Sequence, residues 1–216
     1  MKTSYLSIEG KFEAIHVEKA SKFIAYATEI NNTNSFKEVL STIKALHPKA
    51  RHHCYAYRLG MDLNNFRCDD DGEPSGTAGK PILRQIDSFD LTNVLLVVVR
   101  YFGGTLLGVA GLTKAYKTAA LEVLKKSVII ERNIEHIYMI KTNESIMYKI
   151  LHLVKQMGVN YKNLVLGDNA SIDLELPLIV QSKFFSKLKS SIENKDPIQD
   201  LINFEIQDCE IINLSI

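Results

Sequence analysis

Apolar residues recur with regular periods over most of the chain, and these periods predict its secondary structure. Residues 94–99 form an unbroken apolar run, which is typical of a strand buried on both faces. A glycine-rich turn and a helical stripe follow, which predict a long helix that ends near Ser127. The stripe consists of Leu112, Ala115, Tyr116, Ala119, Ala120 and Val123, with Lys114, Lys117 and Lys125 outside it. Shorter patterns predict strands at 12–17, 23–28 and 53–58, a helix at 35–46 with Ser35 as its N-cap, and one helical turn at 81–86.

The pattern from residue 134 onward predicts a second group of elements. The expected order is strand 137–141, helix 143–157, strands 161–166 and 171–176, helix 178–192 and strand 204–206. This is the order of a split βαβ, or ferredoxin-like, domain. We therefore expect an α+β protein with two domains, an N-terminal α/β domain at 1–133 and a ferredoxin-like βαββαβ domain at 134–216.

Composition places the chain among ordinary globular proteins. It has 216 residues, of which 46% are hydrophobic and 24% charged. The apolar run at 94–99 is too short to span a bilayer and the first residues contain no signal-like apolar segment, so we expect a cytoplasmic protein without membrane contact. Cys54, Cys68 and Cys209 are odd in number, widely spaced and free of any CxxC pair. This spacing favours reduced thiols, and we expect no metal and no cofactor.

Residues 67–84, RCDDDGEPSGTAGKPILR, follow neither a helical nor a strand period. Four carboxylates and several turn-forming residues indicate a loop that turns more than once and presents backbone N–H groups. The carboxylates do not have the spacing of an EF-hand, and we interpret them as solvated or as partners that orient Arg100, Arg84 or Lys80. The N–H groups around Ser75, Gly76 and Thr77 are then the expected contact points. A nucleophilic site that combines Ser75 or Thr77 with His52 or His53 has no geometry fixed by the sequence, so no catalytic residue is assigned.

Positive charge is concentrated in the first part of the chain. Residues 1–133 carry 18 Lys and Arg against 14 Asp and Glu, whereas residues 134–216 carry 8 against 11. All six arginines fall in the first part. Arginine offers a planar fork for phosphate or carboxylate, so anion contacts are one interpretation and internal ion pairs are the other.

The glycine-rich turn at 101–111, YFGGTLLGVAG, also has two interpretations. A strand followed by glycines and a helix start can direct N–H groups and the positive helix end toward an anion. The glycines could equally allow tight turning and close packing of the helix on the strand. A P-loop is excluded, because Val109 and Ala110 follow Gly108 where Lys and Ser or Thr are required.

Three segments together resemble the YigZ/IMPACT family. They are DDGEPSGTAGKPIL at 70–83, VVVRYFGGTLLG at 97–108 and GLTKAY at 111–116, and the resemblance extends more loosely over the whole chain. Ala110 stands where the family usually has glycine, and Lys114 where arginine is frequent. Replacing arginine by lysine keeps the charge but loses the bidentate fork.

The resemblance implies two modules of the kind found in the translation machinery. The first domain is then similar to a domain of a small-subunit ribosomal protein and to domain IV of elongation factor G, a fold with a left-handed βαβ crossover. The second resembles the ferredoxin-like last domain of that factor. Eukaryotic relatives act in the control of the translational stress response through protein partners. Since a shared fold is weak support for a shared function, the resemblance gives an expectation only.

Two main hypotheses follow for function. The first is a non-enzymatic regulator associated with translation, which binds RNA, the ribosome or a translation-related protein through the N-terminal domain. The alternative is an enzyme or small-molecule binder that takes a phosphorylated or carboxylated ligand between the DDGEPSGTAGKP and RYFGG motifs. A protein-only interaction module is a third possibility. The candidate binding residues are Arg51, His52, His53, Asp70, Glu73, Ser75, Gly76, Thr77, Lys80, Arg84, Arg100, Tyr101, Gly103, Gly104, Gly108 and Lys114.

Overall fold

The protein divides into two compact units. The structure, a computed structural model, describes residues 2–193 and 205–215. Unit I is Tyr5–Arg132, and unit II contains residues 2–4 together with the described residues from Asn133 onward. None of the helices in these described ranges is both long and apolar enough to cross a membrane.

Unit I is built on a five-stranded sheet. The strand order is β2-β3-β6-β4-β5, and every neighbouring pair is antiparallel. β6 lies in the centre, and its residues from Val94 to Val99 are all fully buried, which confirms the strand expected from the apolar run. A separate pair of strands joins β1 to β7. The strands are β1 (Ser4–Ile8), β2 (Lys11–Glu18), β3 (Ser21–Glu29), β4 (His52–Arg58), β5 (Phe66–Asp69), β6 (Val94–Tyr101) and β7 (Ile129–Asn133).

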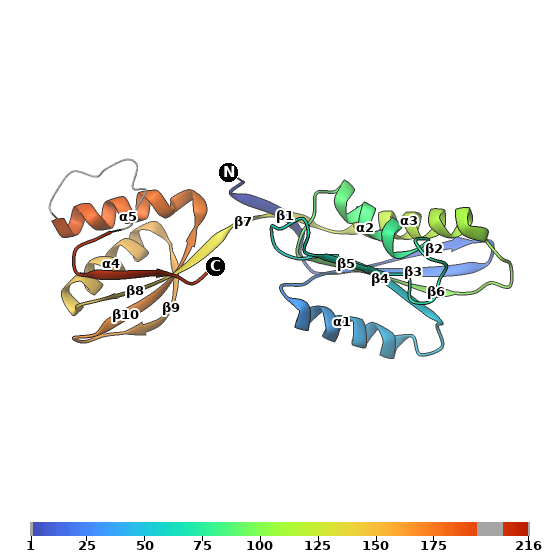
Figure 1. The fold of residues 1–216 in the computed structure, drawn as a ribbon, viewed down its shortest axis with the longest axis horizontal. Helices are drawn as coiled ribbons and strands as arrows, with labels where there is room; N and C mark the ends of the chain where they lie inside the picture. The colour runs from blue at the N-terminus through green and yellow to red at the C-terminus, as the bar shows by residue number, and fades with distance from the viewer. Residues whose placement is uncertain (1, 194–204, 216) are drawn as a thin grey trace. The chain divides into compact units, whose positions relative to one another are not determined.

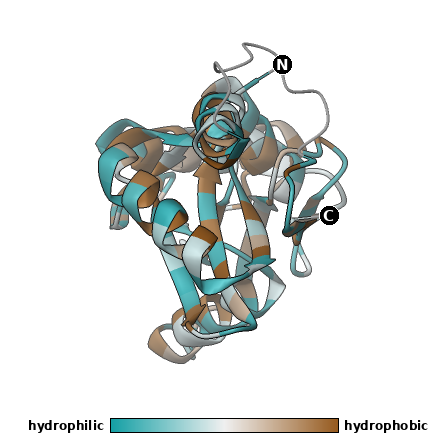
Figure 2. Ribbon diagram, turned by 90° about the vertical axis from the view of Figure 1, so that its left-hand side faces the viewer, coloured by the Kyte–Doolittle hydropathy of each residue, from teal (hydrophilic) through white to brown (hydrophobic). Residues whose placement is uncertain are grey.

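Three helices cover this sheet. α1 (Thr33–Leu46) lies on one face, and α2 (Gly79–Ser88) and α3 (Gly108–Lys126) lie on the other (Figure 1). All six residues of the predicted stripe on α3 are buried, whereas Lys114, Lys117 and Lys125 are exposed. The helical ribbons are banded in apolar and polar colours, as expected for helices with one buried face (Figure 2).

Two connections in unit I join parallel strands. α1 links β3 to β4 with β6 between them, and α2 links β5 to β6 with β4 between them. The connection through α2 differs from the connection through α1 in three respects. Its strands run in the opposite direction, it moves across the sheet in the opposite direction, and its helix covers the opposite face. Three reversals invert the handedness of a crossover. One of the two connections is therefore left-handed, an arrangement that is rare among βαβ units.

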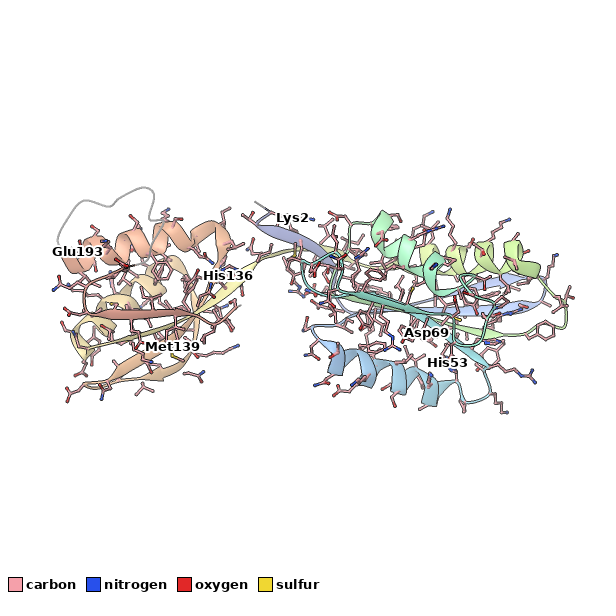
Figure 3. The ribbon with its side chains drawn as sticks, in the orientation of Figure 1. Lys2, His53, Asp69, His136, Met139 and Glu193 are labelled. Carbon is pink, nitrogen blue, oxygen red and sulfur yellow. The ribbon has the colours of Figure 1, made fainter. Side chains whose placement is uncertain are left out.

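Unit II contains a four-stranded antiparallel sheet with helices on one face. The strand order is β11-β8-β10-β9. One side of the sheet packs against both helices in a single core, whereas Met139 belongs to the opposite side (Figure 3). The elements are β8 (Glu135–Thr142), α4 (Glu144–Met157), β9 (Asn160–Val165), β10 (Ala170–Pro177), α5 (Leu178–Glu193) and β11 (Cys209–Asn213).

Three details of the predicted elements were wrong. The N-cap of α1 is Asn32, whose Oδ1 accepts from the N–H groups of Asn34 and Ser35, both at 2.9 Å; Ser35 is instead the third helical residue of the capping box. α2 extends over 79–88 rather than a single turn. The last strand is Cys209–Asn213. Within the expected strand at 204–206, Phe204 lies outside the described residues, and Ile206 is a core residue that precedes the strand.

Candidate functional site

The acidic loop, residues 70–78, begins with a carboxylate that stabilises the start of α2. The N–H groups of Gly76, Ala78 and Gly79 donate to the two carboxylate oxygens of Asp70 at 2.7 to 3.0 Å. Ala78, at the N-cap position of α2, has no side-chain cap of its own. Burial alone would raise the pKa of Asp70, but the three N–H donors, aided by Lys80, lower it overall. Asp70 therefore serves as the cap that α2 lacks.

Asp71 holds the loop against the strands that precede it. The N–H of His53 donates to Asp71 Oδ2 at 2.6 Å, and the N–H of Asp71 donates to Asp69 Oδ1 at 2.8 Å. His52 Nδ1 lies 2.8 Å from the carbonyl oxygen of Asp71, and since a carbonyl oxygen only accepts, Nδ1 is the donor. His53 belongs to β4 and Asp69 to β5, and both residues are labelled in Figure 3. Burial lowers the pKa of His53, only partly offset by Asp71.

Glu73 joins the acidic loop to the central strand. Its side chain is 3% exposed, and its Oε1 accepts from Arg100 Nη1 at 2.7 Å and from Tyr116 Oη at 2.8 Å. Cys54 Sγ lies 3.3 Å from Tyr116 Oη, and burial raises the pKa of both groups. A buried polar network of this kind is stable only when its members are satisfied together. The prediction that a carboxylate of this loop orients Arg100 is confirmed for Glu73.

Two glycines allow close approach of backbone segments around this network. A Cβ on Gly79 would lie 2.7 Å from the backbone nitrogen of Asp69. A Cβ on Gly103 would overlap the backbone of Ala20 and Ser21, and the Gly103 N–H donates to Ser21 Oγ at 3.1 Å. These contacts favour the packing interpretation of the glycine-rich turn at Gly103. The N–H of Gly103 is not free for an anion.

A basic hollow opens where β4 begins and β6 ends. Its volume is about 680 Å³. Its lining residues come from the segment before β4, from the end of β6 and from the turn before α3, and none of the described residues that line it carries a carboxylate. His52 pairs directly with Arg100 across the two strands, so their side chains lie on the same face. The lining residues are Lys49, Arg51, His52, Arg100, Tyr101, Phe102 and Leu106.

The walls of the basic hollow combine fixed and exposed groups. Arg100 is held by Glu73, and Tyr101 Oη lies 3.0 Å from His47 Nδ1. Phe102 is 57% exposed, and the guanidinium carbon of Arg100 lies 5.6 Å from its ring centre. Lys49 and Arg51 are exposed, and neither forms an ion pair with any described residue. The hollow thus offers uncompensated positive charge beside an aromatic surface.

The structure separates most of the predicted site residues into three groups. Arg51, His52, Arg100 and Tyr101 line the basic hollow. His53, Asp70, Glu73 and Thr77 are held within the protein, whereas Ser75, Lys80, Arg84, Gly104, Gly108 and Lys114 are exposed outside the hollow.

The expectation that the N–H groups of Gly76 and Thr77 face a ligand was wrong. The Gly76 N–H donates to Asp70, and the Thr77 N–H donates to the carbonyl of Pro74 at 3.1 Å. The acidic loop contributes to the hollow indirectly, by way of Glu73 and Arg100.

The candidate binding residues did not include Lys49, Phe102 or Leu106. Lys49 and Arg51 alternate with small or apolar residues just before a predicted strand, and Phe102 lies inside the RYFGG motif. From that motif, the candidate residues were Arg100, Tyr101, Gly103 and Gly104. Phe102, an aromatic residue two positions after Arg100, was the available indication of a stacking surface.

Comparisons with known proteins place the chain among related sequences. A family model described as the Impact N-terminal domain matches residues 19–124. An IMPACT family member from Haemophilus influenzae is 32% identical over 182 residues, which cover 82% of this chain and 85% of that protein. IMPACT family member YvyE from Bacillus subtilis is 31% identical over 170 residues, 79% of this chain and 78% of the relative. A crystal structure of a hypothetical protein, 29% identical, superposes with a TM-score of 0.75 and covers 90% of this chain and 96% of its own.

Proposed function

Because the chain belongs to the IMPACT family, we propose that it is a non-enzymatic regulator associated with translation, which binds RNA through the basic hollow of unit I. The observation that carries the proposal is the lining of that hollow, which combines four basic residues with two aromatic side chains and, within the described chain, lacks carboxylates. A regulator of translation acts where ribosomes are, so the proposal includes a cytoplasmic location.

The chemistry of the hollow suits a nucleic-acid strand. Lysine and arginine contact phosphate oxygens, which supply most of the sequence-independent affinity. Bases of single-stranded RNA stack on exposed aromatic rings, and Phe102 offers such a ring beside Arg100. The chain as a whole is close to neutral, with a net charge of +1. Binding through one local site is therefore favoured over binding through a broad charged face.

The fold supports the same proposal. We propose that unit I has the α/β fold of a ribosomal-protein domain and of domain IV of elongation factor G, and that unit II is ferredoxin-like. The pair of crossovers of opposite hand supports the first assignment. The strand order β11-β8-β10-β9, with both helices on one face, supports the second. Both folds occur in proteins of the translation machinery according to the family resemblance described above.

The proposal is tested by RNA binding of charge-reversed variants. Lys49→Glu with Arg51→Glu removes the exposed cations of the hollow, and Lys117→Glu with Lys125→Glu makes the same charge change on α3, outside it. Fluorescence anisotropy with single-stranded RNA at several salt concentrations gives both affinity and salt dependence. We expect the hollow variant to lose most of its affinity for RNA. The slope of the logarithm of the binding constant against the logarithm of the salt concentration should fall by about 1.4, since each of the two lost phosphate contacts contributes about 0.7.

Two results would contradict RNA binding at this place. Affinity that does not change with salt would remove the electrostatic basis of the proposal. An equal loss of affinity in the two double variants would show that net charge, rather than the hollow, determines binding.

A further inference from the structure

We propose that the basic hollow recognises a phosphomonoester, the phosphate at the end of an RNA strand or on a free nucleotide, with the adjoining base stacked on Phe102. This inference rests on the RNA binding proposed above and specifies which part of the nucleic acid enters the site. It follows from the charge balance, the shape and the aromatic wall of the hollow.

The charge balance of the hollow matches a dianion. Glu73 compensates Arg100 at 2.7 Å. Lys49 and Arg51 are left, each without an ion pair among the described residues, so about two positive charges remain uncompensated. A terminal phosphate carries about −1.5 to −2 near neutral pH, whereas a phosphodiester inside a strand carries one negative charge.

The shape of the hollow favours an end over a continuous strand. Proteins that bind single strands along their length use grooves that follow the backbone over several nucleotides. Here the cations converge on one concavity of about 680 Å³, which falls within the range of about 300 to 1,000 Å³ found for pockets of small ligands. One phosphate and one nucleoside are therefore the natural contents of this site.

The floor of the hollow contains a donor that lacks a partner. Arg100 has a side chain only 7% exposed, and its Nη1 is bonded to Glu73. Its Nε, also buried, has no hydrogen-bond partner in the part of the chain that the structure describes. A buried donor without an acceptor is destabilising, and an anion that reaches the guanidinium would relieve this cost.

The aromatic wall and the next helix complete the site. The Arg100 guanidinium carbon lies 5.6 Å from the centre of the Phe102 ring, which is a cation–π distance, while more than half of Phe102 stays exposed. α3 begins two residues after Leu106, without a side-chain cap and without an acidic residue in its first turn. The first turn of α3 therefore brings no negative charge next to Leu106.

The test compares RNA strands that differ only at their ends. Short single-stranded RNAs with a 5′-phosphate, a 3′-phosphate or hydroxyl groups at both ends are titrated with the full chain, and the fluorescent label is placed at the end opposite the phosphate. We expect one phosphorylated end to tighten binding about tenfold or more over the hydroxyl-ended strand. Arg51→Ala should abolish this preference, whereas Lys117→Ala should retain it.

Competition with small molecules separates the possible sources of the phosphate. A nucleoside monophosphate should displace the phosphorylated RNA, and the corresponding nucleoside without phosphate should not. A phosphoserine peptide that competes as well as the nucleotide would overturn the nucleotide part of the inference.

The two proposals can fail separately. RNA that binds equally tightly with every kind of end would overturn the phosphomonoester inference and leave RNA binding intact. Binding of the monophosphate but of no RNA, lost in Arg51→Ala, would support the phosphomonoester site and contradict the RNA proposal. If neither RNA nor nucleotide binds, both proposals are wrong.

Discussion

The acidic loop and the basic hollow lie close together in unit I and use their polar groups in opposite ways. In the acidic loop, Asp70 accepts three N–H groups and Glu73 accepts two donors, so the polar atoms face inward. In the basic hollow, Lys49 and Arg51 face outward with no carboxylate among the described lining residues. A high density of polar residues in a sequence can therefore mark structural support, while the contact surface lies beside it.

Arg100 connects the two regions. Its Nη1 belongs to the network of the acidic loop, and its side chain lines the hollow. The comparison can thus be tested directly. Changes in the loop should reduce stability, and changes at the rim of the hollow should reduce binding alone.

Replacing Glu73 should have the largest effect. Glu73→Ala leaves Arg100 buried without its counter-ion and removes the acceptor of Tyr116, so we expect the free energy of unfolding to fall by about 3 to 5 kcal/mol. Denaturation with urea, followed by circular dichroism, measures this change. Ser75→Ala, at an exposed position of the same loop, is the control and should change stability by less than about 0.5 kcal/mol. Equal stability of Glu73→Ala and the parent chain would show that the ion pair is not structural.

A methyl group at Gly79 should have the next largest effect. The added Cβ would meet the backbone of Asp69 at 2.7 Å, which cannot move without shifting β5. We expect Gly79→Ala to lower the free energy of unfolding by about 1 to 3 kcal/mol, as for other overpacked sites. The same denaturation experiment applies, and an unfolding midpoint equal to that of the parent chain would disprove the close approach.

The cap formed by Asp70 should make a pH-dependent contribution to the free energy of unfolding. Asp70→Asn keeps the shape but loses the charge that attracts three N–H groups, at a cost of about 1 kcal/mol at neutral pH. Because the pKa of Asp70 is lowered in the folded protein, its contribution is complete above the unfolded carboxyl pKa of about 3.9 and is lost as pH falls through the lower folded value. Stability measured at neutral pH and near pH 3 should therefore differ less in Asp70→Asn than in the parent chain. If stability changes equally between these two pH values in Asp70→Asn and in the parent chain, the Asp70 carboxylate does not cap α2.

Arg51→Ala should have the smallest effect on stability. Its side chain is exposed and forms no ion pair with the described residues, so the free energy of unfolding should change by less than about 0.5 kcal/mol. Loss of RNA affinity in this stable variant would locate function in the hollow. Loss of stability would instead assign Arg51 to the support of the fold.

Regular patterns in the sequence predicted most of unit I. The apolar run of β6 and the stripe of α3 are local signals, since one element contains all the residues concerned. The N-cap at Asn32 and the length of α2 were missed because both depend on side-chain bonds between nearby polar residues. Ile206 misled the prediction of the last strand, because a core residue in a loop resembles part of a strand.

The site was harder to predict because it depends on distant pairing. Register places His52 beside Arg100, and Lys49, Arg51 and Phe102 come from segments about fifty residues apart. No period along the sequence encodes which two strand ends meet. The motifs identified Arg100 and Glu73, whose ion pair was one of the interpretations, but the direction in which the loop turns its N–H groups became visible only in three dimensions.

The central place of β6 has a consequence for the order in which the chain acquires structure. β6 separates β3 from β4, yet it is made after both of them. While the chain is synthesised from its N-terminus, the edges of β3 and β4 that pair with β6 have no partner until residues 94–101 emerge. The sheet, the Glu73–Arg100 pair and the hollow therefore cannot be complete before β6 has been synthesised.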